Sequence, residues 1–175
     1  SHNDVIIRNC EFTNNTGGEG AAIMVGGILY KHDAFWGYNI EGNNMTIENC
    51  TFTNNHARID GQTGTYTDAG PDPSEPTGNA GAVFVYGNNT KIINTVFENN
   101  TAANNGAAMY IHGSGTIVEN STLTGNSAVN GTVYIEGSNT KITNSNFFNN
   151  TAENGAGAYV EGENTQITDS EASYN

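Results

Sequence analysis

The stretch from Ile92 to Ile111, IINTVFENNTAANNGAAMYI, contains both halves of a unit that recurs along the chain. Its first half places an aliphatic residue at 92, an asparagine at 94, an aromatic residue at 97 and another asparagine at 100. Its second half is a pair of small residues followed by a short apolar run that ends at Ile111. Such a run, rich in β-branched and aromatic residues, predicts a strand rather than a helix.

The first half of this unit occurs six times, with the last copy partly decayed. The spacings between successive copies are 40, 45, 26, 24 and 25 residues, so the period is about 25 residues and two early copies carry insertions. Self-similarity at a fixed period of this size is typical of solenoids, in which stacked units bury a common core. The copies are anchored by Ile7, Ile47, Ile92, Val118, Ile142 and Ile167.

The repeat predicts an all-β fold, a right-handed single-stranded parallel β-helix of about six rungs. We expect three strands in each rung and a spacing of about 4.8 Å between rungs, so that like residues lie over like. The chain is interpreted as a single domain, residues 1–175, that is a fragment of a longer repeat array. The insertions are expected at about 28–43 and 57–79.

Stacking in register predicts columns of equivalent residues. The aliphatic anchors and the aromatic residues that follow them, from Phe12 to Phe147, are expected to form two inner columns. Asparagine tolerates the left-handed backbone of a tight corner and also forms ladders between stacked strands. We therefore expect a ladder of side-chain amides at the corner that follows the aliphatic anchor, formed by Asn9, Asn49, Asn94, Asn120 and Asn144.

Composition and charge exclude some partners. The chain has 29 Asn and 21 Thr but only five Lys plus Arg, and its formal net charge is −13. A nucleic-acid partner requires a cluster of basic residues to neutralise phosphates, and anionic membranes repel an acidic surface. No apolar stretch reaches the length of a membrane span. We expect neither nucleic-acid binding nor membrane insertion.

The motifs FTNN, FENN and FFNN, followed by GNAGAVFV and NNGAAMYI, resemble the FxxN and GGA[ILV] repeats of chlamydial polymorphic outer-membrane proteins. The acidic, Asn- and Thr-rich composition is also similar to that of adhesin-like surface proteins of methanogenic archaea. Both resemblances imply a β-helix displayed on the cell surface, often as an adhesin. They carry over no binding residue, because the shared motifs are scaffold positions; Leu123 also departs from the aromatic pattern.

The first insertion contains the only tryptophan of the chain among other aromatic and polar residues. Aromatic rings beside polar groups are typical of sugar recognition, although the same rings can pack on the scaffold instead. The candidate ligand-binding residues here are Tyr30, His32, Asp33, Phe35, Trp36 and Tyr38.

The second insertion is a long Gly-, Pro- and Asp-containing loop. Its carboxylates could supply the oxygen ligands that Ca²⁺ prefers, but their spacing matches no known calcium loop, and a solvated acidic loop is the alternative. We expect no cofactor, with Asp68, Asp72 and Glu75 as the Ca²⁺ candidates.

The last strand of each rung provides the other candidate surface. Alternation of side chains along a strand turns one aromatic column outward, with a second column of polar and aromatic residues beside it. An exposed aromatic stripe would suit a glycan or an extended peptide; stacking that only stiffens the sheet is the alternative. The candidates are Phe84, Tyr86, Tyr110, His112, Tyr134 and Tyr159, with Met24, Glu136 and Glu161 in the same columns.

Cys10 and Cys50 occupy equivalent positions of neighbouring rungs, where the other copies have Thr or Ser. The rung spacing of about 4.8 Å permits a disulfide, and two thiols in a column of small residues are equally compatible with the sequence.

Three functional classes follow from these features. The first class is a cell-surface recognition module that binds a glycan or protein on another cell surface, and the insertions and the aromatic stripe favour it. The second class is a passive β-helical stalk. A polysaccharide lyase or hydrolase is disfavoured, because the basic residues are scattered and Glu136 and Glu161 are column repeats rather than an acid–base pair. We therefore expect an extracellular, non-catalytic adhesin that binds carbohydrate.

Overall fold

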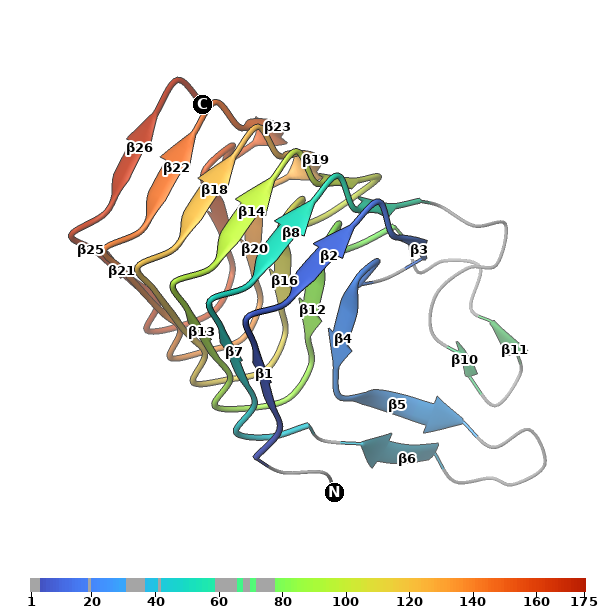
Figure 1. Ribbon diagram of the computed structural model, residues 1–175. Helices are drawn as coiled ribbons and strands as arrows, with labels where there is room; N and C mark the ends of the chain where they lie inside the picture. The colour runs from blue at the N-terminus through green and yellow to red at the C-terminus, as the bar shows by residue number, and fades with distance from the viewer. Residues whose placement is uncertain are drawn as a thin grey trace.

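The computed structural model describes residues 4–18, 20–30, 37–40, 42–58, 66–67, 70–71 and 78–175, with the backbone alone at 27–30, 37–40, 66–67 and 70–71. These residues form short strands joined by turns, and the strands stack into a parallel β-helix (Figure 1). The predicted fold is confirmed. No helix in this part of the chain is long and apolar enough to cross a membrane.

Two six-stranded parallel sheets contain the first half of the repeat, one on each side of a corner. Sheet I consists of β1 (Ile6–Arg8), β7 (Thr46–Glu48), β13 (Lys91–Ile93), β17 (Ile117–Glu119), β21 (Lys141–Thr143) and β25 (Gln166–Thr168). Sheet II consists of β2 (Glu11–Thr13), β8 (Thr51–Thr53), β14 (Val96–Glu98), β18 (Thr122–Thr124), β22 (Asn146–Phe148) and β26 (Glu171–Ser173).

Two five-stranded parallel sheets complete the first five rungs. Sheet III consists of β3 (Thr16–Gly17), β9 (His56–Ala57), β15 (Thr101–Ala102), β19 (Ser127–Asn130) and β23 (Thr151–Asn154). Sheet IV consists of β4 (Ile23–Val25), β12 (Val83–Val85), β16 (Met109–Ile111), β20 (Val133–Ile135) and β24 (Ala158–Val160). Each of the first five rungs therefore has four strands, and the prediction of three was wrong, because the strands of sheet III are short and consist mainly of small and polar residues.

The inner columns stack as the repeat predicts. Ile47 pairs in register with Ile7 on one side and Ile92 on the other, and Ile47 and Ile92 are fully buried. The rings of Phe12 and Phe52 lie 4.8 Å apart and those of Phe52 and Phe97 lie 5.0 Å apart, both nearly parallel. The core is therefore a set of parallel ladders along the axis of the coil.

The corners between sheets I and II and between sheets II and III are made by single residues with left-handed backbone. The turn from sheet I to sheet II is made by asparagine at positions 9, 49, 94, 120 and 144, all with φ between 48° and 56°. The first asparagine of the FxNN motif does the same between sheets II and III, for example Asn99 at φ 53°. Asparagine adopts this conformation more readily than other residues with a side chain, which explains much of the composition.

The main amide ladder lies in a different column from the predicted one. The predicted asparagines at 9, 49, 94, 120 and 144 are exposed, and the inter-rung amide contact in their column is a long one, 3.4 Å from Asn49 Nδ2 to Asn9 Oδ1. The buried ladder is formed by the second asparagine of the FxNN motif and its equivalents. Its members are Asn15, Asn55, Asn100, Asn126, Asn150 and Asn175.

Each interior member of this ladder has all its side-chain hydrogen bonds satisfied. Asn100 Nδ2 donates to Asn126 Oδ1 of the next rung at 3.0 Å and to the Phe52 carbonyl of the preceding rung at 2.9 Å. Its Oδ1 accepts from the backbone N–H and Nδ2 of Asn55, at 3.0 and 2.9 Å. Because a buried polar group without a partner is costly, this position tolerates asparagine and few other residues.

A glycine column marks the turn from sheet IV back to sheet I. A Cβ atom added at Gly113 would overlap the carbonyl oxygen of Gly87, and one added at Gly87 would overlap that of Gly42. Consecutive rungs therefore approach so closely here that no side chain fits between their backbones.

The two insertions contribute antiparallel hairpins outside the stacked sheets. β5 (Gly27–Tyr30) pairs with β6 (Gly37–Ile40) between the first and second rungs. β10 (Tyr66–Thr67) pairs with β11 (Gly70–Pro71) between the third and fourth strands of the second rung. In Figure 1 both hairpins lie outside the coil, beyond β4.

Asn126→Ala is expected to destabilise the protein by about 3 kcal/mol or more, since each buried partner left unpaired costs roughly 1–3 kcal/mol. It removes the acceptor of Asn100 and the donor to the Phe97 carbonyl. Asn146→Ala, on the exposed face of sheet II, is the matched control and should change stability by less than about 0.5 kcal/mol. Urea unfolding measures both; equal midpoints would show that the ladder contributes little.

Gly113→Ala should largely prevent folding, because the new methyl group meets the backbone of the neighbouring rung. Gly157→Ala is the control, since an added Cβ there meets only the Ala172 Cβ, at 3.9 Å. We expect the control to retain the wild-type circular dichroism spectrum and melting temperature. A well-folded Gly113→Ala protein would contradict the close approach of the rungs.

Candidate functional site

The outer face of sheet IV carries two neighbouring columns of side chains that we call the ledge. Register pairing places Met24, Phe84, Tyr110, Tyr134 and Tyr159 in one column. The inner neighbours in each strand, such as Met109 and Ile111 around Tyr110, are fully buried in the core. The second column follows the strands and contains Tyr86, His112, Glu136 and Glu161.

Exposure of the ring column differs from the prediction. Met24 is 47% exposed, but Phe84 and Tyr134 are only 6% and 8% exposed although they point outward. The reason is that the rings lie flat on one another, with centroids 4.7 Å apart for Phe84 and Tyr110, 4.8 Å for Tyr110 and Tyr134, and 5.2 Å for Tyr134 and Tyr159. Ring faces inside the stack are therefore unavailable to a ligand, and the wet aromatic stripe expected from the sequence is mostly closed.

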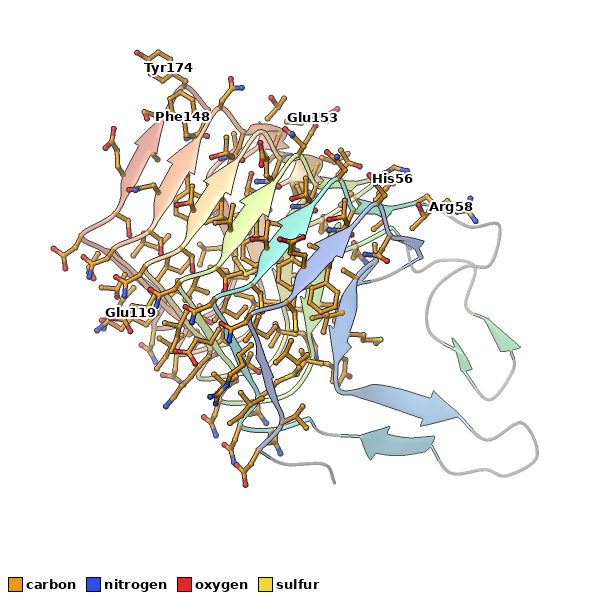
Figure 2. The ribbon with its side chains drawn as sticks, in the orientation of Figure 1. His56, Arg58, Glu119, Phe148, Glu153 and Tyr174 are labelled. Carbon is orange, nitrogen blue, oxygen red and sulfur yellow. The ribbon has the colours of Figure 1, made fainter. Side chains whose placement is uncertain are left out.

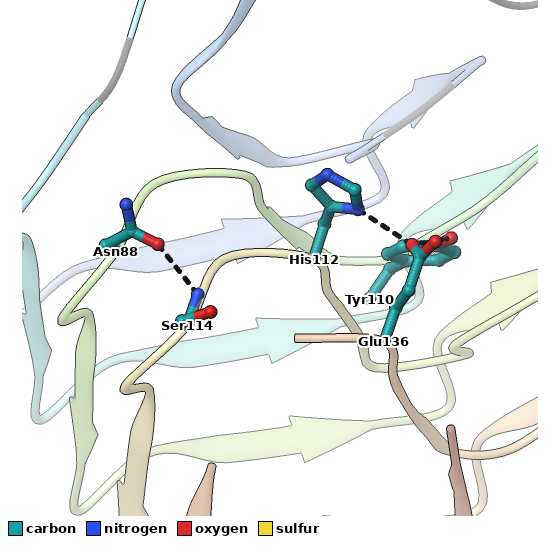
Figure 3. Close-up of polar contacts among 5 residues, drawn as sticks. All are labelled: Asn88, Tyr110, His112, Ser114 and Glu136. Atoms are coloured by element: carbon teal, nitrogen blue, oxygen red, sulfur yellow. Dashed lines mark hydrogen bonds and ion pairs between the residues drawn. The ribbon is translucent and has the colours of Figure 1, made fainter. Parts of the chain in front are cut away.

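The second column presents polar groups to solvent at the side of this stack. Tyr110 Oη donates to Glu136 Oε2 at 2.7 Å, and His112 Nδ1 lies 2.7 Å from the same oxygen (Figure 3). His112 in turn stacks on Tyr86 with a centroid distance of 4.5 Å. The side chains of His112 and Glu136 remain 40% and 41% exposed. The ledge therefore offers a carboxylate and an imidazole, held in place by a phenol, to a molecule in solution.

Ionisation of the ledge follows from these contacts. Burial is the largest influence on Glu136 and acts to raise its pKa, but the hydrogen bonds from His112 and Tyr110 outweigh it and lower the pKa below 4.5. Burial and then the hydrogen bond to Glu136 raise the pKa of Tyr110 well above 10. Burial and the hydrogen bond to Glu161 do the same for Tyr134. At neutral pH the ledge therefore combines the ionised carboxylate of Glu136 with the neutral phenols of Tyr110 and Tyr134.

The first insertion is rooted beside this ledge. The backbone N–H groups of Tyr86 and Gly87 both donate to the carbonyl of Val25, the last residue of β4, at 2.8 and 3.0 Å. β5 begins two residues later, and Gly26 and Gly42 lie against each other where the insertion leaves the coil. The hairpin β5–β6 therefore starts next to Tyr86, at the N-terminal end of the ledge.

Several predicted site residues fall outside what the structure describes. Tyr30 and Tyr38 lie in β5 and β6, where only the backbone is described. No group of three or more His, Cys, Asp or Glu side chains that could hold a metal ion occurs among the described residues. The predicted site residues that lie outside the described part of the chain are His32, Asp33, Phe35 and Trp36 in the first insertion and Asp68, Asp72 and Glu75 in the second.

The acceptors of the tyrosine hydroxyls are the residues that sequence reasoning undervalued. Glu136 and Glu161 belong to the outer column but are not among the ligand-binding residues that the sequence predicts. The signal was present in the repeat: each glutamate lies one rung beyond the tyrosine whose hydroxyl it accepts, Tyr110 for Glu136 and Tyr134 for Glu161. This hydrogen bond joins residues of neighbouring columns in successive rungs, so it becomes evident only when the rungs are stacked.

Cys10 and Cys50 are free thiols in the structure, the second of the two alternatives open from the sequence. Cys50 is buried and Cys10 partly exposed. They occupy the position at which later rungs carry Thr95, Ser121 and Ser145.

Comparison with known proteins gives one short match. Residues 94–110 match the Chlamydia polymorphic membrane protein repeat. This segment runs from the corner at Asn94 through β14 and β15 into β16, and includes FENN and GAAMY. No curated protein and no solved structure matches the chain.

Glu136→Gln should reduce the pH dependence of stability. Because the pKa of Glu136 is lowered on folding, its contribution is present above about pH 4.5 and is lost as the pH falls through the lower folded-state value. The carboxyl is well exposed to solvent, so the effect should not exceed about 1 kcal/mol. Urea midpoints measured between neutral pH and about pH 3 should fall less steeply for Glu136→Gln than for wild type. Glu119→Gln, on sheet I (Figure 2), is the control and should show the wild-type pH dependence. The same pH dependence for Glu136→Gln and wild type would contradict a lowered pKa of Glu136.

Proposed function

We propose that this chain is a non-catalytic recognition module displayed on the cell surface, where it adheres to a glycan on another surface. The match to a repeat of a polymorphic membrane protein supports the surface location and the adhesin class. The archaeal resemblance rests on the acidic, Asn- and Thr-rich composition and remains part of the proposal.

The observation that carries the proposal is the ledge together with the insertion rooted beside it. The stacked rungs hold its phenols, imidazole and carboxylates in fixed positions, which lowers the entropy lost on binding. Because ring faces within the stack are covered, ring edges, carboxylates and His112 are the groups that meet the ligand along the ledge. The aromatic residues of the first insertion, Trp36 above all, would supply the open ring faces that sugars pack against.

Glu136 and Glu161 also favour certain ligands over others. Carboxylates accept hydrogen bonds from sugar hydroxyls or amino groups, and a chain of net charge −13 repels acidic polysaccharides. We therefore expect neutral or amino-bearing glycans to bind and sulfated or uronate-rich glycans not to bind. We expect binding without a cofactor. In the alternative, the acidic second insertion holds Ca²⁺ and binding is lost when a chelator removes the ion.

The test is a glycan array with the 175-residue chain, in Ca²⁺ and then in EDTA, followed by titration of the best glycan. Trp36→Ala should weaken binding at least tenfold, because truncating an aromatic anchor costs about 2 kcal/mol. Tyr174→Ala is the control, since Tyr174 is 81% exposed and contacts Phe148 on sheet II, away from the ledge (Figure 2).

Each outcome of this experiment has a distinct meaning. Loss of binding in EDTA would assign a role to Asp68, Asp72 and Glu75. Equal loss of glycan affinity in Trp36→Ala and Tyr174→Ala would show that the first insertion does not contact the glycan. An array with no bound glycan would overturn carbohydrate recognition, and pull-down of surface proteins with the same chain would then separate protein binding from a passive stalk.

A further inference from the structure

One side-chain column of the corner between sheets I and II changes its chemistry along the chain. In the later rungs the hydroxyls of Thr95, Ser121, Ser145 and Ser170 each donate to the carbonyl two residues earlier, at 2.9–3.0 Å. In the first two rungs the same position is cysteine, and each thiol makes the equivalent contact. Cys10 Sγ lies 3.1 Å from the Arg8 carbonyl and Cys50 Sγ lies 3.2 Å from the Glu48 carbonyl.

Serine makes this bond better than cysteine, because a thiol is a weak donor. The hydrogen bond therefore gives no reason for sulfur at these two positions. The two cysteines stand in the rungs joined by the first insertion, one before it and one after it. Their placement points to a property that serine lacks, which is the ability to form a covalent cross-link.

The geometry brings the two residues within reach of each other. Glu11 pairs in register with Thr51, and the N–H of Thr51 donates to the carbonyl of Cys10 at 2.9 Å. Cys10 and Cys50 are therefore stacked one rung apart, about 4.8 Å between Cα atoms, inside the range of roughly 4.4–6.8 Å that disulfides occupy. Cys50 Sγ also lies 3.7 Å from the carbonyl of Ile7, so it already leans toward the first rung.

We propose that Cys10 and Cys50 form a reversible disulfide that ties the first rung to the second across the base of the first insertion. The bond requires each thiol to rotate away from its carbonyl acceptor and takes the place of two weak hydrogen bonds. It closes the segment from 10 to 50, which contains β5 and β6.

The chemistry is a thiol–disulfide exchange with a small-molecule disulfide such as oxidised glutathione. The thiolate of Cys10, the more exposed of the two, attacks the glutathione disulfide, forms a mixed disulfide and releases one glutathione thiolate. The thiolate of Cys50 then attacks Cys10 Sγ and releases the second. Two protein thiols are oxidised and one glutathione disulfide is reduced to two thiols, since the two protons lost by the protein thiols are taken up, through solvent, by the two glutathione thiolates. Burial raises the pKa of Cys50 and outweighs the backbone hydrogen bonds that lower it, so the second step should be the slower and should accelerate with rising pH.

The cross-link matters because it fixes the root of the insertion. Cross-linking restricts the unfolded chain and ties the two sides of the hairpin together, so that β5 and β6 leave the coil from a fixed base. Disulfides persist in oxidising compartments, in agreement with the proposed surface location. The inference does not depend on the nature of the ligand and can be tested without one.

The experiment oxidises the folded chain with glutathione disulfide and counts its free thiols, which should fall from two to none. Tryptic cleavage after Arg8, Lys31 and Arg58 places the cysteines in separate peptides, 9–31 and 32–58, so a non-reduced digest should contain them joined. The melting temperature of the oxidised protein should exceed that of the reduced protein, by on the order of 10 °C.

Cys10→Ser and Cys50→Ser are the matched controls, since serine occupies this column in later rungs. Each should melt at the temperature of the reduced wild type, whether or not it is oxidised. Two thiols that persist in the folded chain but oxidise after denaturation would overturn the proposal. So would a glutathione adduct that never resolves into joined peptides, or an equal shift in melting temperature in the serine variants.

Discussion

The structure depends on satisfying buried polar groups between rungs. A rung of about 25 residues has tight corners, which restrict the conformations that their residues can adopt. The side-chain amides that point into the coil at these corners cannot reach water. The column from Asn15 to Asn175 solves this by letting each amide bond to the next amide and to the backbone of the preceding rung. Because every interior member needs a neighbour on both sides, the ladder is cooperative along the axis and favours one register between neighbouring rungs.

This requirement explains a composition that would otherwise indicate disorder. Asparagine serves two separate purposes, as a left-handed corner residue that is exposed, such as Asn94, and as a ladder residue that is buried, such as Asn100. Glycine is required where the backbones of successive rungs nearly touch, as at Gly113. With polar and small residues assigned to corners, a modest number of aliphatic and aromatic residues is sufficient, since each is buried against its equivalents above and below.

The candidate site is a by-product of the same periodicity. A scaffold that repeats residue types must also repeat its outer face, so tyrosines accumulate on sheet IV and stack on one another. Stacking turns what would be an aromatic binding surface into a stiff spine whose hydroxyls point at carboxylates. The residues that could give the site specificity lie where the repeat is interrupted. Tyr86 and His112 occupy the column that carries glutamate in later rungs, and the first insertion leaves the coil beside them.

The sequence alone determined the fold class, the number of rungs, the inner columns and the position of Cys10 against Cys50, because a fixed period with one residue type per position translates directly into stacking. It did not reveal the short strands of sheet III, in which small and polar residues predominate, nor which asparagine column is buried, since both columns have the same residue at similar spacing. Only the tertiary structure decided that Phe84 and Tyr134 are covered and that Glu136 joins Tyr110 to His112. Exposure and diagonal hydrogen bonds depend on how far apart successive rungs lie and how side chains lean along the axis, and a repeat pattern carries neither quantity.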